Sequence, residues 1–326
     1  MKTITIILPA YNEEDSFSEL KQCMEQVIID NPDYDWEFLM INDGSSDCTL
    51  DKMKEICRED YHFHYIDLSR NYGKEIAIMA GIDYAKGDAL IIMDADMQHP
   101  IEVIPEMIKY WEEGYEDVYA QRQHSNESWL KRITSKAYYK ILQKSTNIPI
   151  QKDTGDFRLL DRKCINALKE MKETDRNNKG MFSWIGFKKK GISYQQKKRR
   201  YGKTKWSYYK LINLALNGIT SFTTTPLRMA SFFGIIISFF AFLYLIYIIF
   251  NTLIIGDPVR GYPTLMVTIL FLGGIQLISL GIIGEYLSHI FNETKHRPAY
   301  LIREKLVNDD KKRNLGVVNN LNNLSS

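Results

Sequence analysis

The sequence has few cysteines, and they form no recognisable motif. Its 326 residues include four of them, Cys23, Cys48, Cys57 and Cys164. None belongs to a C-x-x-C pair and none lies near a histidine at zinc-finger spacing, which argues against a disulfide scaffold and a zinc module. A reduced environment facing the cytosol is the simpler interpretation.

The chain as a whole also lacks an excess of positive or negative charge. Lys and Arg number 42 against 40 Asp and Glu, and 45% of the residues are hydrophobic. This composition excludes a disordered chain and a collagen-like fibre. The N-terminus has no long apolar run, because polar residues 12–15 follow the first strand-like stretch at once. It therefore predicts a buried strand rather than a signal peptide.

Acidic residues are absent between Lys188 and Lys210, where ten residues are Lys or Arg. Outside this run, 32 basic residues stand against 40 acidic ones, so the rest of the chain has a net charge of −8. The near-neutral total thus combines an acidic body with one basic segment. Such a run is either a solvated face or a surface that contacts lipid headgroups. The hydrophobic sequence that follows favours the second interpretation.

Two runs of about 22 residues, 229–250 and 263–284, have no charged residue at all. Each is long enough to cross a hydrocarbon core of ~30 Å as a helix. The loop between them, 251–262, has one Arg and one Asp, whereas both flanks are richer in Lys and Arg. The positive-inside rule therefore places the loop outside and both flanks in the cytoplasm. Residues 206–228 are predicted to be an amphipathic juxtamembrane segment on the inner leaflet, and 285–326 a cytoplasmic tail that is disordered from Val307.

Short apolar runs alternate with helical patterns in residues 1–205. Strands are expected at 4–8, 38–41, 65–68, 89–93 and 118–120, and helices at stretches such as 13–29 and 101–110. This alternation predicts an α/β fold with a mostly parallel sheet and helices on both faces. Ligands in such folds bind outside the carboxyl ends of the strands.

Polar clusters follow four of these strands, at residues 9–14, 42–47, 69–74 and 94–100. Any one of them alone would be read as a turn or a helix start. Four at successive strand ends predict a ligand site. Gly44 and Gly73 allow a tight turn or a close approach of the ligand. Asp94 and Asp96 share one face if the strand continues through them, and such a pair is either solvated or holds a cation such as Mg²⁺ or Mn²⁺.

Together these motifs resemble those of family 2 glycosyltransferases with the Rossmann-like GT-A fold. The resemblance is to polyprenyl-phosphate glycosyltransferases of the bactoprenol glucosyltransferase group and, more distantly, to dolichol-phosphate mannose synthase. It covers nearly the whole chain and includes 153–158, 202–206 and 284–287. It implies a cytoplasmic GT-A catalytic domain over residues 1–205. His99 stands where the family commonly has Asp, and Gln196 stands where an Arg is usual, which weakens any assignment to an arginine pair.

The resemblance also implies roles for individual residues. Donor binding falls to Pro9, Tyr11, Glu13, Asp43 and Lys74. The catalytic residues are Asp94, Asp96 and Asp156, and Asp94, Asp96 and Gln98 would hold Mg²⁺ or Mn²⁺. The acceptor phosphate would be bound by Arg122, Lys131, Arg132, Arg199, Lys203 and Lys205. The alternative for each of them is a charge that is solvated or contacts lipid headgroups. Asp153 could replace Asp156 as the carboxylate on the acceptor side. A second alternative for either residue is a structural role, as an acid paired with Arg158.

The reaction implied is inverting transfer of a sugar from a UDP-sugar to undecaprenyl phosphate at the inner leaflet of the plasma membrane, for cell-envelope glycosylation. UDP-glucose is favoured, UDP-N-acetylglucosamine comes next and GDP-mannose is a distant third. An anionic lipid phosphate can attack the sugar without a strong base, so cationic positioning matters more than proton transfer. Membrane lipids, a homo-oligomer, a flippase and a downstream transferase are the further partners suggested, and no nucleic acid is expected.

Two alternative functions remain open. A processive polysaccharide synthase would share the donor site, but such enzymes usually have a Gln-x-x-Arg-Trp motif and more spans, and the sequence has neither. A non-catalytic membrane accessory protein would retain the fold alone. The intact Asp94 and Asp96 pair argues against the second alternative.

Overall fold

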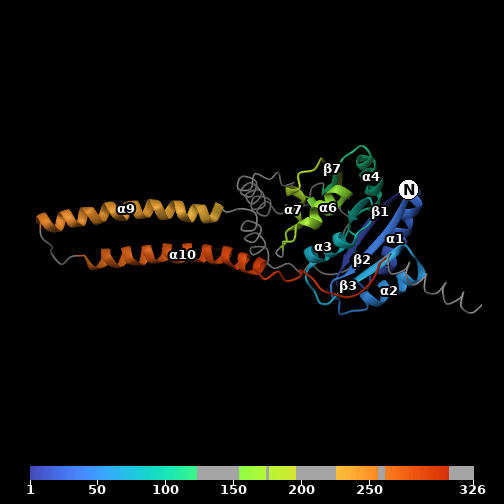
Figure 1. The fold of residues 1–326 in the computed structure, drawn as a ribbon, viewed down its shortest axis with the longest axis horizontal. Helices are drawn as coiled ribbons and strands as arrows, with labels where there is room; N and C mark the ends of the chain where they lie inside the picture. The colour runs from blue at the N-terminus through green and yellow to red at the C-terminus, as the bar shows by residue number, and fades with distance from the viewer. Residues whose placement is uncertain (123–153, 174–175, 196–224, 256–260, 308–326) are drawn as a thin grey trace, which may run out of the picture. The chain divides into compact units, whose positions relative to one another are not determined.

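The structure, a computed structural model, describes residues 1–122, 154–173, 176–195, 225–255 and 261–307 (Figure 1). These residues fall into two compact units. The first contains the described parts of residues 1–195 together with residues 298–307, and the second contains the long helices α9 and α10.

Strands and helices alternate along the first unit. Its strands are β1 (Lys2–Ala10), β2 (Tyr34–Asn42), β3 (Phe63–Leu68), β4 (Ala89–Ile92), β5 (Asp117–Arg122), β6 (Thr154–Asp161), β7 (Lys189–Tyr194) and β8 (Ile302–Leu306). Its helices are α1 (Phe17–Asp30), α2 (Thr49–Glu59), α3 (Lys74–Tyr84), α4 (Ile104–Glu112), α6 (Arg162–Glu170) and α7 (Asn178–Trp184), with a 3-10 turn at Ile101–Val103. The five strands expected from the sequence are all present.

The eight strands form one sheet in the order β7-β5-β6-β4-β1-β2-β3-β8. β1 pairs in parallel with β2 and β4, and β2 pairs in parallel with β3. β6 lies antiparallel between β4 and β5, and β8 lies antiparallel along the outer side of β3. Because β6 is antiparallel to both of its neighbours, strands β1 to β5 all run in one direction. The prediction of an α/β fold with a mostly parallel sheet is confirmed.

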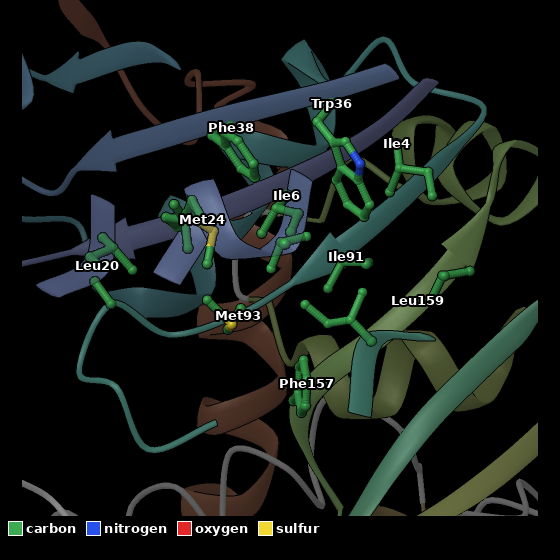
Figure 2. Packing of buried hydrophobic residues seen from close by; sticks show 14 of the residues in the cluster. Ile4, Ile6, Leu20, Met24, Trp36, Phe38, Ile91, Met93, Phe157 and Leu159 are labelled. Carbon is green, nitrogen blue, oxygen red and sulfur yellow. The ribbon is translucent and has the colours of Figure 1, made fainter. Parts of the chain in front are cut away.

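One face of the sheet carries the main hydrophobic core. Ile4 and Ile6 of β1 lie with Leu20 and Met24 of α1 in a cluster that also includes side chains of β2, β4, α2 and α4 (Figure 2). The buried residues of α1 recur every three or four positions, which is the spacing of one face of a helix. Fully burying each such side chain contributes roughly 1.5–3 kcal/mol. This packing fixes the strands whose ends hold the polar clusters.

Helix α3 covers the opposite face of the sheet. A Cβ added at its Gly81 would lie 3.0 Å from side-chain carbons of Ile7, so the helix backbone approaches β1 closely. Ile7 is fully buried, in line with a strand that is apolar on both faces. Helices on both faces leave the carboxyl edge of the strands as the place for a ligand.

Three strands were not among those expected from the sequence: β6, β7 and β8. β6 was missed because it buries charged residues, and β7 because it lies inside the basic run that begins at Lys188. In β7, Lys189 is largely buried, and its ammonium contacts the carbonyl of Phe182 and lies 3.7 Å from Asp117. The start of the basic run is therefore part of the eight-stranded sheet, which corrects its interpretation as a membrane-contacting surface. The rest of the run, from residue 196, lies outside the described residues.

The second unit contains α9 (Thr225–Ile255) and α10 (Tyr262–Thr294). Among the described residues one stretch, Phe271–Thr294 of α10, is long and apolar enough to cross a membrane, with a mean hydropathy of 1.4. Met229–Tyr244 of α9 is apolar but shorter. The first span of the predicted pair, 229–250, therefore stays a prediction, and so does the juxtamembrane segment, most of which lies outside the described residues. After α10 the chain returns to the sheet as β8.

Candidate active site

Polar side chains from four segments meet at one edge of the sheet. Asp43 follows β2, Lys74 is the first residue of α3, and Asp94 lies just beyond the end of β4. β6 runs antiparallel to β4 with Arg158 opposite Ile92, so Asp156 lies at the same edge as Asp94. This is the edge where the sequence predicts a ligand site.

Lys74 joins two carboxylates of this edge. Its Nζ lies 2.7 Å from Oδ1 of Asp94 and 2.7 Å from Oδ2 of Asp156. Asp156 is largely buried, whereas Lys74 and Asp94 are partly open to solvent. One ammonium thus neutralises part of the charge of two carboxylates that would otherwise repel each other.

The charges of this ion pair stabilise each other. Burial alone would raise the pKa of Asp156, but the Lys74 ammonium, with Lys179 and Arg158 nearby, outweighs it and lowers this pKa to about 2. Desolvation alone would lower the pKa of Lys74, but the two carboxylates raise it above its usual value. The second oxygen of Asp156, Oδ1, is buried and has no hydrogen-bond partner in the described part of the chain. Asp156 therefore offers an ionised acceptor inside the site.

Asp43 holds the loop between β3 and α3. Its Oδ1 accepts a hydrogen bond of 2.7 Å from the Tyr72 amide, and its Oδ2 accepts one of 2.9 Å from the Gly73 amide. Burial raises the pKa of Asp43, while these two amides oppose the rise. Gly44, at φ 64°, lies against the same loop, and a Cβ there would come within 2.4 Å of the Arg70 backbone. Asp43 and Gly44 thus fix the loop that leads into Lys74.

The loops after β1 and β2 are cross-linked by hydrogen bonds. The Asn12 amide donates to Oγ of Ser45, and the Ser46 amide donates to Oδ1 of Asn12. The Glu13 amide donates to Oγ1 of Thr49 at 3.0 Å. Pro9 lies in β1, and Tyr11 is exposed at the start of the loop. Of the predicted donor-binding residues, Tyr11, Glu13 and Asp43 therefore lie on two neighbouring, connected loops, and Pro9 lies at the end of β1 beside them.

The segment after β4 is a turn, not a continuation of the strand. β4 ends at Ile92, and Met97 has a φ of 60°. The condition for placing Asp94 and Asp96 on one face of a strand is therefore not met. Asp96 is largely buried, and its Oδ1 accepts a hydrogen bond of 3.2 Å from the Gln98 amide. The turn still keeps Asp94, Asp96 and Gln98 on one short segment beside Lys74.

His99 braces this turn from inside. Its Nδ1 accepts a hydrogen bond of 3.1 Å from the Asp94 amide, and its ring stacks on Phe157 with centroids 4.7 Å apart. Burial lowers the pKa of His99, in keeping with a neutral ring that accepts at Nδ1. The residue that departs from the common family pattern thus acts as a support of Asp94 in this chain.

Of the predicted acceptor-side cations, Arg122 is described. It ends β5, and its Nε donates to the Tyr194 hydroxyl at 3.4 Å. Its guanidinium also lies close to Gly155, beside Asp156. Asp153 lies outside the described residues, and so do the remaining cations predicted for this side: Lys131, Arg132, Arg199, Lys203 and Lys205.

Comparison with known families agrees with this arrangement. The model for glycosyl transferase family 2 matches residues 5–168, which hold Asp43, Lys74, Asp94 and Asp156. The chain belongs to glycosyl transferase family 2. A second model, the GtrB C-terminal hairpin, matches residues 225–290, which span most of α9 and α10.

Relatives of this family 2 glycosyltransferase match almost end to end. An uncharacterized glycosyltransferase of Synechocystis sp. is 44% identical over 302 residues, which cover 92% of this chain and 95% of the relative. The bactoprenol glucosyl transferase of Shigella phage SfV is 41% identical over 303 residues, covering 93% and 98%. A prophage bactoprenol glucosyl transferase homolog of Escherichia coli strain K12 is 41% identical over 301 residues, covering 92% and 98%.

The predicted metal ligands of the glycosyltransferase suit a cation that is coordinated by both protein and substrate, rather than one coordinated by protein alone. In the described part of the chain, no group of three His, Cys, Asp or Glu side chains is placed to hold a metal ion. Asp94, Asp96 and Gln98 offer carboxylate and amide oxygens, which are the ligands that Mg²⁺ and Mn²⁺ prefer. Mg²⁺ commonly takes only one or two protein carboxylates and completes its shell with substrate phosphates. The residues present fit such a cation.

Some supports of the site were not predicted from the sequence. Besides His99, Glu75 accepts a hydrogen bond of 2.8 Å from the Asn178 amide, and the Asn178 side chain donates to the Glu75 carbonyl. These bonds tie α7 to the start of α3, directly beside Lys74. No local sequence pattern predicts this contact, because Asn178 lies about a hundred residues further along the chain than Glu75. The sequence shows only that Glu75 follows Lys74.

Proposed function

We propose that this glycosyltransferase transfers a sugar from a UDP-sugar, with UDP-glucose favoured, to a polyprenyl phosphate such as undecaprenyl phosphate. The observation that carries the proposal is the union, in one chain, of a family 2 domain with a GtrB C-terminal hairpin. Relatives with the same extent are named bactoprenol glucosyl transferase, which supports a lipid acceptor and glucose as the sugar. UDP-N-acetylglucosamine remains the second donor to test.

In the proposed reaction, an oxygen of the lipid phosphate forms a bond to C1 of the sugar as the bond from C1 to the donor diphosphate breaks. UDP leaves, and a single displacement inverts the configuration at C1. Tyr11, Glu13 and Asp43, with Pro9, would form the donor pocket at the ends of β1 and β2. Asp94, Asp96 and Gln98 would hold Mg²⁺ or Mn²⁺, and a cation bound there would neutralise charge on the departing diphosphate.

Lys74 and Asp156 act in this proposal through charge and position. The acceptor phosphate is already anionic, so no side chain has to remove a proton from it. With its pKa near 2, Asp156 is ionised at neutral pH and is a weak base. Its role is to hold the Lys74 ammonium in place beside Asp94. Arg122 and the predicted cations outside the described residues would bind the lipid phosphate.

The membrane arrangement is part of the proposal. We place both hairpin helices, α9 and α10, across the plasma membrane, with the catalytic unit on the cytoplasmic side. A polyprenyl chain is retained by the bilayer, since exposing each CH₂ costs roughly 0.8 kcal/mol. The enzyme must therefore reach the phosphate at the inner leaflet. A catalytic unit joined to a membrane hairpin meets this requirement.

The test uses membranes that contain the full-length protein, polyprenyl phosphate and a panel of labelled nucleotide sugars. The expected result is label in the organic phase with one donor, UDP-glucose first, that depends on added lipid phosphate. Membranes from cells without the protein give the background. Failure of every donor to produce organic-soluble label, or label in a water-soluble polymer, would overturn the proposal.

A further inference from the structure

The chain returns to the catalytic sheet after the hairpin. Residues 298–307 belong to the same compact unit as the candidate site, and β8 lies antiparallel along β3 with Ile66 opposite Lys305. The segment is also fixed by side chains: the Tyr300 hydroxyl donates to Oδ2 of Asp83 at 2.8 Å, and Lys54 of α2 forms an ion pair with Glu304. The residues that leave the membrane helices thus form the outer strand of the donor-side half of the sheet.

Arg303 of this strand reaches two groups at the end of β3. Its Nη1 lies 3.2 Å from Oδ2 of Asp67, a carboxylate that is fully buried, and its Nη2 donates to the Ser69 carbonyl at 2.8 Å. The Ser69 amide in turn donates to the Leu301 carbonyl at 2.8 Å. Ser69 is therefore held through both its carbonyl and its amide by the segment that follows the hairpin.

Ser69 is the first residue of the loop 69–73, whose other end is bound by Asp43. Asp43 binds the amides of Tyr72 and Gly73, and the Ser69 hydroxyl lies 2.9 Å from the Tyr72 hydroxyl. On the other side, Asp67 accepts a hydrogen bond of 2.6 Å from Asn42, the last residue of β2. The loop 69–73 is thus fixed at one end by Asp43 and at the other by Arg303, and Lys74 follows directly.

We propose that Arg303 is a positioning residue for the donor site, holding loop 69–73 in the form that presents Asp43 and Lys74. Through it, the strand that follows the membrane hairpin supports nucleotide binding. This inference rests on the proposed function, in that the donor binds at this edge of the sheet. It adds a residue outside the matched family 2 segment to the parts on which donor binding depends.

The contacts of β8 show that Arg303 does more than help the strand to cover the edge of the sheet. Backbone pairing with β3 would cover the edge with any side chain at position 303. The neighbouring side chains of β8 fix the strand to other helices, since Lys305 lies over the Tyr84 ring at 4.5 Å and Glu304 pairs with Lys54. The Arg303 side chain is 57% exposed. Its guanidinium nevertheless forms an ion pair with the buried Asp67 and donates a hydrogen bond to the loop.

The experiment compares Arg303→Ala, Arg303→Lys and the matched control Lys305→Ala in the full-length protein in detergent. Binding of UDP in the presence of Mn²⁺ is measured, together with hydrogen exchange of the Tyr72 and Gly73 amides. For Arg303→Ala we expect a rise in Kd for UDP on the order of tenfold or more, as for loss of hydrogen bonds to a charged group. Exchange of both amides should accelerate. Lys305→Ala should leave both readouts at the wild-type values.

Arg303→Lys keeps a charge for Asp67 but has no planar fork to hold the carboxylate and the Ser69 carbonyl together, so we expect an intermediate effect. This variant decides the matter if Arg303→Ala does not fold. In turnover assays the KM for the UDP-sugar should rise, while kcat at saturating donor and the KM for lipid phosphate stay near wild type. Unchanged UDP affinity and amide exchange in both Arg303 variants would overturn the inference. If wild-type protein binds no UDP, the proposed function fails instead, and amide exchange still decides whether Arg303 holds the loop.

Discussion

The ammonium of Lys74 lies 2.7 Å from the buried carboxylate of Asp156, 82 positions along the chain. The same ammonium binds Asp94, so one positive charge serves two negative ones and the cluster keeps a net negative charge. Under the proposed function, a site of that charge would attract a divalent cation and would still have an ammonium for an anionic diphosphate. The pair links the predicted metal segment to the predicted acceptor-side carboxylate.

Replacing Lys74 should slow sugar transfer strongly. In Lys74→Met the two carboxylates lose their shared cation, and the buried Asp156 loses the ammonium of its ion pair. We expect kcat to fall by roughly 10²- to 10³-fold, the usual effect of removing one charge-stabilising group from an active site. Formation of organic-soluble label measures the rate. Lys109→Met, a change at an exposed lysine of α4, is the matched control, and equal rates for the two variants would refute this role of Lys74.

Gly44 should tolerate no side chain. A Cβ there would lie 2.4 Å from the Arg70 backbone, and φ is 64°. Gly114 also has a positive φ, 87°, but a Cβ there meets nothing within 4 Å, so Gly114→Ala isolates the cost of backbone strain. That cost is about 1–3 kcal/mol. We expect Gly44→Ala to lower the melting temperature more than Gly114→Ala and also to weaken UDP binding. Equal melting temperatures and unchanged UDP affinity would contradict the close approach of the two loops.

The ion pair of Arg158 and Asp117 should be costly to break from one side. Both side chains are almost fully buried, with Nη1 3.2 Å from Oδ2, and the guanidinium lies 4.0 Å from the Phe182 ring centre. Arg158→Met leaves Asp117 with Lys189 as its remaining cation, and we expect a loss of about 3–5 kcal/mol in the free energy of unfolding.

A double-mutant cycle checks this assignment. Arg158→Met combined with Asp117→Asn should recover more than half of that loss, because the buried carboxylate that lost its guanidinium is gone. Lys163→Met, which breaks the exposed ion pair with Glu116, should leave stability unchanged. Additive losses in the double variant would show that the two residues stabilise the fold independently. Chemical denaturation of the full-length protein supplies the values.

Removing divalent cations should abolish transfer reversibly. Asp94, Asp96 and Gln98 supply oxygen ligands of the kind that hold Mg²⁺ or Mn²⁺, and the diphosphate leaving group needs its charge neutralised. We expect a chelator to stop formation of organic-soluble label, and added Mn²⁺ or Mg²⁺ to restore it. In Asp96→Asn the restoration should need a far higher metal concentration or fail. Undiminished activity in excess chelator would rule out the proposed metal site.

How far the fold could be predicted depended on how its strands are buried. β1, β2 and β4 contain short, mainly apolar runs, at residues 4–8, 38–41 and 89–92, and were predicted from the sequence. β6 has Asp156 and Arg158 among its buried residues, and such charges are usually read as exposed. β8, with the sequence IREKL, has the composition of a solvated tail. Its place in the sheet depends on pairing with β3 more than two hundred residues away, which no local pattern encodes.

The candidate site divides in the same way. Asp43, Lys74, Asp94 and Asp96 follow strands, so topology alone brings them to one edge. The contact of Lys74 with Asp156 depends on β6 running antiparallel beside β4, which the sequence did not predict. The support of Asp94 by His99 and of loop 69–73 by Arg303 arises from tertiary packing. Side chains on strand ends were thus predictable, and the residues that hold them in place were not.

The most direct test of the central claim identifies both products of the purified full-length protein given polyprenyl phosphate, a divalent cation and the donor selected by the panel. The proposed displacement predicts UDP and a lipid with one sugar on one phosphate, in equal amounts, with neither formed by Asp96→Asn. Release of UMP with a diphosphate-linked lipid, or of UDP with free sugar alone, would contradict it.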